Sequence, residues 1–257
     1  MLIALGSVKS SPGVTTSALA LAAFRPGSAG VVIEADPAGG DVKAWRGLAG
    51  EPGLAALAAE ARRSADAGLA AVHASELPGG LRVVAAPTGV EQAGSAVGVL
   101  AASGTGFLRA VAAGAQPVLA DLGRLDPSSP ALGVLPHADR VLILLRPSLS
   151  EVTRVMERLD ALARLLRPGA GLAAILIGSG YPAEQVERSL CMPVLAVLPE
   201  DRTAALAVAG LAGAGRGLSR SKLARAARSA WTRIEQPPTG SGDSLVPDHL
   251  TAIGAAR

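Results

Sequence analysis

The chain has 257 residues and a formal net charge of +3, and hydrophobic residues make up 49% of it. That length suits one large α/β domain with a sizeable core, although length alone leaves two small domains open. Aromatic residues are only 2% of the chain, so Ala, Val and Leu must fill the core. The single cysteine, Cys191, excludes an internal disulfide and favours a reducing compartment.

The sequence argues against a membrane span and against a signal peptide. No stretch runs 18 residues or more without Gly, Pro or a charged residue, as a transmembrane helix would. Residues 1–8 lack the basic start and the cleavage site of a signal peptide. We therefore expect a cytoplasmic protein, either free or peripheral at a membrane or nucleoid.

Apolar runs of strand length alternate with Ala- and Leu-rich segments of helical length. The runs lie at residues 2–5, 31–34, 81–85, 118–121, 141–145, 173–177 and 194–197, and the helical segments lie at 16–24, 54–63, 91–102 and 150–166. Several runs are continuous rather than alternating, which is typical of strands buried on both faces of a parallel sheet. This order predicts a doubly wound, mostly parallel α/β sheet with helices on both faces.

Two regions depart from this alternation. Residues 45–80 are rich in Ala and Gly and weakly patterned, so we expect helices and loops at one edge of the sheet. Residues 236–257 are polar and turn-forming, which predicts a flexible C-terminal tail after a domain of residues 1–235.

The first 22 residues have the layout that phosphate binding needs. An apolar strand leads into a loop of small residues and a helix that begins with hydroxyl residues. Backbone N–H groups of such a loop and helix start can point at an anion. The standard pattern G-x-x-x-x-G-K-[ST] is broken here, because Val8 replaces its first Gly and Val14 replaces its Lys. From the loop alone, a chance turn between strand and helix explains the pattern equally well.

The loop nevertheless resembles the deviant Walker A motif of the ParA/MinD family of P-loop ATPases, K-G-G-x-G-K-T-[TS]. Four further segments follow in the family's order: V-V-I-E-A-D-P at 31–37, P-V-L-A-D-L-G at 117–123, residues 138–152, and residues 180–201, which end in P-E-D. The resemblance covers residues 1–235. In the loop, Lys9, Gly13, Thr15 and Thr16 match, whereas Ser10, Ser11 and Val14 depart from the motif.

The resemblance implies a site for ATP and Mg²⁺. The residues that would contact the nucleotide are Lys9, Ser10, Ser11, Pro12, Gly13, Val14, Thr15 and Thr16, with Pro199 and Asp201 beside the base. Thr15 and Asp121 would hold the metal, and Asp36 would orient the attacking water. Glu34 stands where the family has its first Asp. Gly178-Ser179 replaces an Asn that recognises adenine in the family, which leaves the choice between ATP and GTP open.

Val14 in the position of the P-loop lysine allows two interpretations. In the first, Lys9 supplies the charge across a homodimer with nucleotide at its interface, and the chain is at most a slow ATPase. In the second, the pocket is a nucleotide-free scaffold that binds a protein partner. The presence of Lys9, Thr15, Asp36 and Asp121 favours the first. A metabolic enzyme on a related P-loop scaffold ranks last, because the sequence offers no separate substrate-binding constellation.

The implied function is an ATP-dependent dimeric switch that positions or assembles cellular machinery for division, partitioning, or a pilus or secretion apparatus. The CpaE/TadZ-like branch of the family, which localises pilus-assembly machinery, also has a small neutral residue at the lysine position. Residues 77–92 resemble that branch as well. The identity of the partner stays open.

The last predicted helix is basic and amphipathic. Residues 216–236 contain six Lys or Arg, and apolar residues recur at helical spacing: Leu223, Ala227, Ala230, Trp231 and Ile234. The favoured interpretation is a structural helix whose apolar face packs on the sheet. The alternative is weak contact with an anionic membrane or nucleic acid through residues 216–233. The three histidines have no metal-ligand spacing, so we expect no zinc site.

Overall fold

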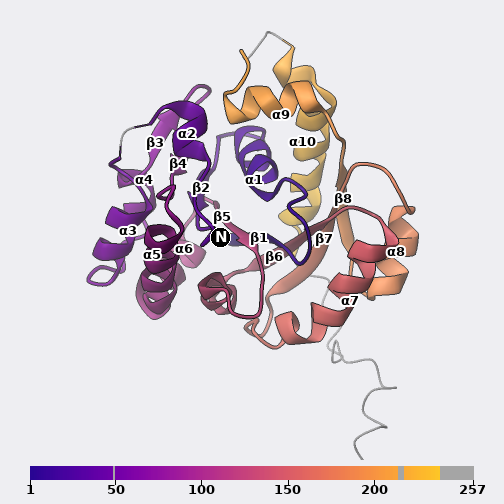
Figure 1. Cartoon of the computed structure of the whole chain (residues 1–257), viewed down its shortest axis with the longest axis horizontal. Helices are drawn as coiled ribbons and strands as arrows, with labels where there is room; N and C mark the ends of the chain where they lie inside the picture. The colour runs from indigo at the N-terminus through magenta and orange to yellow at the C-terminus, as the bar shows by residue number, and fades with distance from the viewer. Residues whose placement is uncertain (49, 214–216, 238–257) are drawn as a thin grey trace, which may run out of the picture.

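An eight-stranded sheet forms the centre of the computed structural model, which describes residues 1–48, 50–213 and 217–237 (Figure 1). The strand order is β3-β4-β2-β5-β1-β6-β7-β8, and all neighbours are parallel except β3 and β4. The predicted mostly parallel sheet is therefore confirmed. The strands are β1 (Leu2–Ser7), β2 (Val31–Glu34), β3 (Ser75–Leu77), β4 (Leu81–Val84), β5 (Val118–Arg124), β6 (Arg140–Leu145), β7 (Gly171–Ile177) and β8 (Val194–Leu198).

The central strands are buried on both sides, which explains their continuous apolar runs. All six residues of β1 are buried. Successive side chains of a strand point to opposite faces. Leu2 and Ala4 accordingly join one apolar core, and Ile3 and Leu5 join the other.

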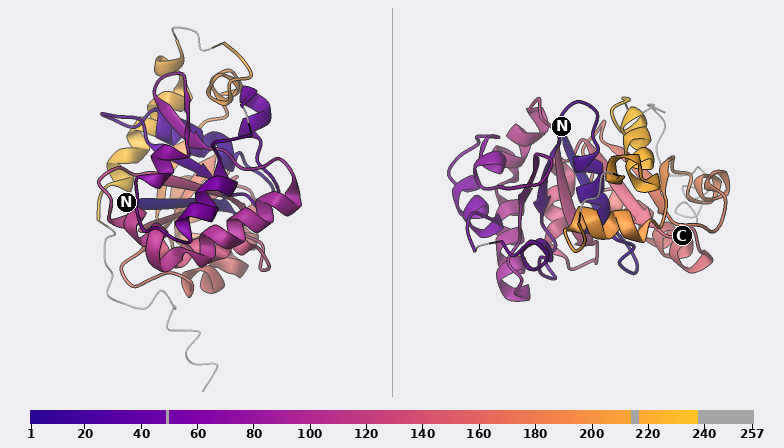
Figure 2. Two further views of the ribbon diagram at one scale, coloured as in Figure 1. Left: turned by 90° about the vertical axis from the view of Figure 1, so that its left-hand side faces the viewer. Right: turned by 90° about the horizontal axis from the view of Figure 1, so that it is seen from above.

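Helices cover both faces of the sheet (Figure 2). The core that contains Ile3 is closed by α1 (Val14–Ala23), α9 (Arg202–Ala209) and α10 (Lys222–Ile234). The core that contains Leu2 is closed by α3 (Leu54–Ala61), α5 (Val90–Ala102), α7 (Leu149–Ala163) and α8 (Ala183–Leu190). Shorter helices connect these elements: α2 (Val42–Arg46), α4 (Leu69–Val72), the π-helix η1 (Gly104–Leu108), α6 (Arg109–Ala113), and the 3₁₀ helices η2 (Pro130–His137) and η3 (Leu218–Arg220).

Every predicted apolar run forms a strand, and one further strand was not predicted. Residues 75–77 pair antiparallel with β4 at the edge of the sheet, with Leu77 opposite Leu81. A three-residue strand with one buried side chain is too short to show a period in the sequence. The rest of the weakly patterned region forms short helices at that edge, as expected. Most of the predicted tail, residues 238–257, lies outside the described residues.

The topology brings three loops together at one edge of the sheet. β5 lies between β1 and β2, and all three strands are parallel. The loops after their carboxyl ends therefore lie side by side, which is where open α/β sheets bind ligands. Within the described residues no single helix is long and apolar enough to cross a membrane; α5 and residues 106–113 pass that test only jointly, across a bend of 72°.

Candidate functional site

The loop between β1 and α1 leaves the start of α1 open to an anion. Gly13 precedes the helix with φ of 93°, a left-handed conformation that glycine adopts without steric cost. Because its N-cap residue is Gly13, the first turn of α1 has no side-chain cap from that position within the described residues. The unpaired N–H groups of that turn, together with the positive end of the helix dipole, favour a negative ligand. The role of this loop in binding phosphate stays a prediction.

Lys9 and Val14, the two residues at which the loop is unusual, lie in opposite environments. Lys9 is exposed, and within the described residues its ammonium forms no hydrogen bond or ion pair. Val14 is only 5% exposed and belongs to the apolar core that α1, α9 and α10 close. Val14 therefore anchors the first turn of α1 in the core and brings no charge to the loop.

Thr15 and Asp121, the predicted metal ligands, lie next to each other. Asp121 sits in β5 directly opposite Leu5 of β1 and is fully buried. Its Oδ1 accepts a hydrogen bond from the N–H of Gly123 at 3.0 Å, while its Oδ2 is buried and, among the described residues, accepts no hydrogen bond of good geometry, although the Thr15 hydroxyl lies near the carboxyl group. Burial raises the pKa of Asp121 to about 7, and the adjacent Thr15 hydroxyl and the Gly123 N–H oppose that rise.

The donor set fits Mg²⁺. Carboxylate and hydroxyl oxygens are ligands that this ion prefers, and it usually keeps several waters. An unpaired carboxylate oxygen in a buried position is costly unless a cation or proton compensates it. Among the described residues, no three His, Cys, Asp or Glu side chains are close enough to hold a metal by themselves. A metal here would therefore complete its shell with water and phosphate oxygens.

Asp36 is held against the turn that follows Asp121. Its Oδ1 accepts a hydrogen bond from the N–H of Ala38 at 2.8 Å. Its carboxyl group packs on the backbone of Gly123, so closely that any side chain at position 123 would overlap it. Gly123 also has φ of 58°, so both space and conformation call for glycine. Burial raises the pKa of Asp36, and the Ala38 N–H opposes this.

Glu34 organises the site in a way that the sequence analysis did not anticipate. The side chain is 1% exposed and accepts three backbone hydrogen bonds, from Asp41 at 2.7 Å, Val42 at 3.1 Å and Ala86 at 2.8 Å. It therefore ties the loop that carries Asp36 to the end of β4. Burial raises its pKa, and these N–H groups oppose the rise. An acidic residue ending a buried strand was the available signal.

The two residues predicted beside the base lie after β8, and one of them caps helices. Asp201 Oδ1 accepts from the N–H of Ala204 at 3.1 Å in the first turn of α9, and Oδ2 accepts from Leu223 at 3.5 Å in α10. Both carboxyl oxygens are thus occupied by backbone donors. Pro199 is half-buried, and its role at a base stays a prediction.

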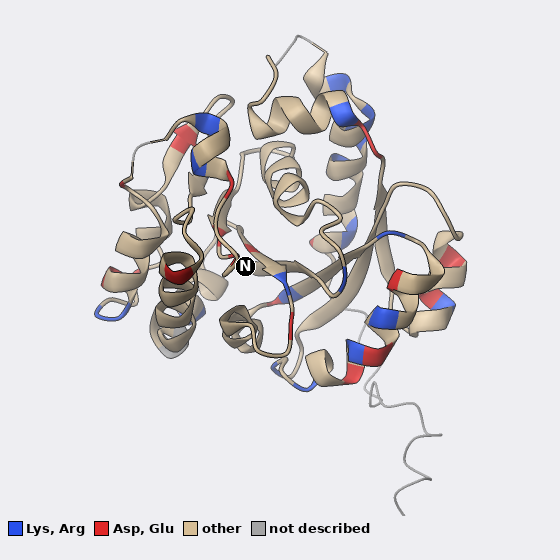
Figure 3. Cartoon of the chain, viewed as in Figure 1, with Lys and Arg blue, Asp and Glu red and all other residues tan. Residues whose placement is uncertain are grey.

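The basic C-terminal helix packs as the favoured interpretation predicts. The predicted apolar stripe of α10 is buried, and the Trp231 indole N–H donates to the carbonyl of Leu21 in α1 at 2.8 Å. Lys and Arg lie on the outer side of α10 (Figure 3). Arg216, the first residue of the predicted basic segment, lies outside the described residues.

No family model and no curated protein matches the sequence. Solved structures do match. The septum site-determining protein MinD complexed with Mg-ADP from Pyrococcus horikoshii is 17% identical with a TM-score of 0.67, covering 91% of this chain and 96% of that one. A ParA family ATPase from Chlorobium tepidum is 19% identical with a TM-score of 0.65, covering 90% and 97%. The chain has the MinD/ParA fold.

A third similar structure is the MinC:MinD cell division protein complex from Aquifex aeolicus, in which the matched chain is 15% identical with a TM-score of 0.61. It covers 96% of this chain and 98% of the matched chain. At these identities the likeness establishes the MinD/ParA fold, while the roles of individual residues depend on the site itself. The P-loop α/β architecture expected from the sequence is therefore confirmed.

Proposed function

We propose that this chain binds Mg-ATP at the loop of residues 8–13. The observation that carries the proposal is the buried Oδ2 of Asp121, which accepts no hydrogen bond of good geometry among the described residues and lies beside Thr15 at the start of α1. A proton or a cation must compensate that oxygen, and the neighbouring N–H groups suit phosphate. The MinD structure of the same fold holds Mg-ADP, which supports this choice of ligand.

The side chains around the loop would have distinct roles. Backbone N–H groups of residues 10–16 would bind the phosphates, and Thr15 and Asp121 would hold Mg²⁺, which when bound neutralises phosphate charge. Asp36, fixed by Ala38 and Gly123, would orient a water molecule. Val14 offers no charge to stabilise the charge that builds up during phosphoryl transfer. Hydrolysis would therefore be slow, well below the ~1 s⁻¹ scale of ordinary enzymes.

The exposed Lys9 is the group that could reach a nucleotide in a second copy of the chain. On this proposal the protein is an ATP-dependent dimeric switch in the cytoplasm that positions or assembles cellular machinery. Similar structures include a septum site-determining protein and a MinC:MinD complex, which supports a positioning role with a protein partner. Lys9→Ala should abolish nucleotide-induced dimerisation in light scattering and leave the fold intact. Normal dimerisation by this variant would leave Lys9 as a surface lysine.

One observation favours a second candidate, a nucleotide-free scaffold. Val14 is a well-packed core residue, as expected if the loop serves only to join β1 to α1.

We also propose that the outer face of α10 attaches the protein peripherally to an anionic membrane or nucleic acid. Lys222 and Arg225, which are both exposed, would make this contact.

Titration calorimetry separates these candidates. ATP and GTP are titrated into the wild type and into Asp121→Asn, in Mg²⁺ and in EDTA. We expect binding to the wild type in Mg²⁺ and much weaker binding in EDTA or in the variant. A ligand at 100 times its Kd should also stabilise the fold by about 2.7 kcal/mol. Equal affinity with and without Mg²⁺ would remove the roles of Thr15 and Asp121, and no binding of either nucleotide would leave the scaffold.

A further inference from the structure

A groove runs between α3 and α5, separate from the phosphate loop. It consists of two cavities of about 830 and 450 Å³, which share Arg62, Ser95 and Val99 as lining residues. None of residues 8–16 lines either cavity. The groove follows α5, whose 13 residues span about 20 Å.

Small residues of both helices line the groove. On α5, Gly94, Gly98 and Ala102 recur every fourth residue along the lining, and Ala55 and Ala59 line it from α3. The distance of approach between packed helices depends on the side chains at their contact, so small side chains allow a close approach. A third helix could therefore lie along the groove with its backbone near α3 and α5.

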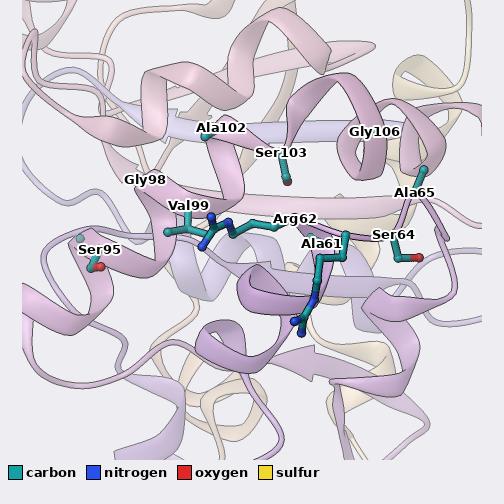
Figure 4. Close-up of a pocket in the computed structure, with 12 residues that line it drawn as sticks. Ala61, Arg62, Ser64, Ala65, Ser95, Gly98, Val99, Ala102, Ser103 and Gly106 are labelled. Carbon is teal, nitrogen blue, oxygen red and sulfur yellow. The ribbon is translucent and has the colours of Figure 1, made fainter.

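The charge of the groove differs between its ends. Arg62 and Arg63 follow α3 and are exposed, and the Arg62 side chain crosses the groove toward Val99 (Figure 4). Within the described residues neither arginine forms an ion pair or a side-chain hydrogen bond, and no acidic residue lines the larger cavity. Glu91 lines the smaller cavity, in the first turn of α5. Arg62 lines both cavities and Arg63 only the larger one, so carboxylates of a ligand would be complementary to the larger cavity and unfavourable beside Glu91.

One of the three serine hydroxyl groups that line the larger cavity is engaged as a donor within the chain. The Ser103 hydroxyl donates to the carbonyl of Leu100 at 2.6 Å, whereas the Ser64 hydroxyl accepts from the N–H of Asp66 at 3.2 Å and keeps its own proton free. An anion over the arginines could therefore also receive hydrogen bonds from hydroxyl groups of the lining. A small polyanion would leave the small apolar side chains of α3 and α5 uncovered, whereas an extended ligand covers them and places carboxylates over the arginines.

We propose that the α3–α5 groove binds an amphipathic helix of a partner protein, with small or aliphatic residues facing α5 and Asp or Glu over Arg62 and Arg63. Amphipathic helices bind grooves of this kind through residues spaced one turn apart. The proposal does not depend on nucleotide binding, so it stands or falls separately from the function proposed above.

The test is a selection from a displayed library of helical peptides of about 14 residues, long enough to cover α5. Selected peptides are then titrated against the wild type and against two groove variants, Arg62→Glu and Ser95→Trp. The matched controls are Arg188→Glu and Ser189→Trp, which change exposed residues of α8 in the same way. Circular dichroism checks that all four variants are folded; if Ser95→Trp is not, Arg62→Glu alone decides.

We expect the selection to yield acidic amphipathic peptides that bind the two control variants as tightly as they bind the wild type. They should bind Arg62→Glu at least about tenfold more weakly, because the variant reverses a charge at the interface. They should not bind Ser95→Trp. A selection without groove-dependent binders overturns the proposal. So do groove-dependent binders that lack acidic residues or tolerate Arg62→Glu. Inorganic phosphate and ADP are titrated in parallel, and groove binding by these alone would replace the helix with a small-anion site.

Discussion

Asp121→Asn isolates the buried carboxyl group at the centre of the site. Asn has nearly the same shape as Asp, and its side-chain oxygen can still accept from the Gly123 N–H. The change removes the ability to ionise and puts an NH2 group in place of Oδ2. The cost of that NH2 group does not depend on pH, so the pH dependence of the stability difference reports the cost of the buried charge.

The magnitude follows from the pKa of Asp121, which is about 7 in the folded protein against 3.8 for an unperturbed Asp. The folded state binds the proton more tightly than the unfolded chain, so this group contributes stability that is fully present below about pH 4 and is lost as the pH rises through 7. A gap of about three units corresponds to about 4 kcal/mol. Without ligand, the wild type should lose that much relative to Asp121→Asn between about pH 4 and pH 8.

Urea unfolding of both proteins across this pH range, without nucleotide or Mg²⁺, provides the measurement. Glu34 and Asp36 have pKa values shifted in the same direction, but both proteins contain them, so their effects largely cancel in the difference. Mg-ATP should then stabilise the wild type at pH 8 and not the variant. A stability difference that stays constant from pH 4 to pH 8 would refute a buried, uncompensated carboxylate at position 121.

Three further predictions concern the surroundings of the site. Val14→Lys should strengthen triphosphate binding and raise phosphate release. The uncharged control Val14→Met should do neither, and it should cost about 1–3 kcal/mol of stability because it adds volume to a packed core. Unchanged affinity in the lysine variant would mean that the loop does not wrap a phosphate. Glu34→Gln should lower the free energy of unfolding by about 1–3 kcal/mol, because an amide has one acceptor oxygen for three N–H groups. A urea midpoint equal to that of the wild type would show that the three hydrogen bonds to Glu34 are dispensable. Trp231→Ala should cost about 3–5 kcal/mol in thermal or urea unfolding, because the ring is fully buried. Arg225→Glu, which loses only an exposed hydrogen bond to the carbonyl of Arg220, should cost less than about 1.5 kcal/mol. An unchanged Trp231→Ala protein would mean that α10 is not structural.

The strands and their order along the chain could be predicted from local pattern. A strand buried on both faces must be apolar at every position, so residues 2–5 and 141–145 are recognisable without knowledge of their neighbours. The same is true of the small-residue loop at 8–13 and of the aspartates after the strands, because these depend on segments of a few residues. That the loops after these strands share one edge follows from parallel strands, but the strand order is decided by tertiary pairing: β5 lies between β1 and β2, and this brings Asp121 beside Thr15.

Tertiary structure alone decided the environment of each side chain. In the sequence, Glu34 stands at the position of the first Asp of the resembled motif. One of its hydrogen-bond donors, Ala86, lies 52 residues away, so its role in tying the loop of Asp36 to the end of β4 depends on how β2 and β4 pair. Asp201 caps α9 locally, but its contact with Leu223 depends on the docking of α10. Val14 occupies the position of a loop lysine in the sequence and a core position in space, because it is buried with the apolar side chains of the core that α1, α9 and α10 close. Burial and long-range hydrogen bonds arise between segments that the chain keeps far apart, so no local pattern records them.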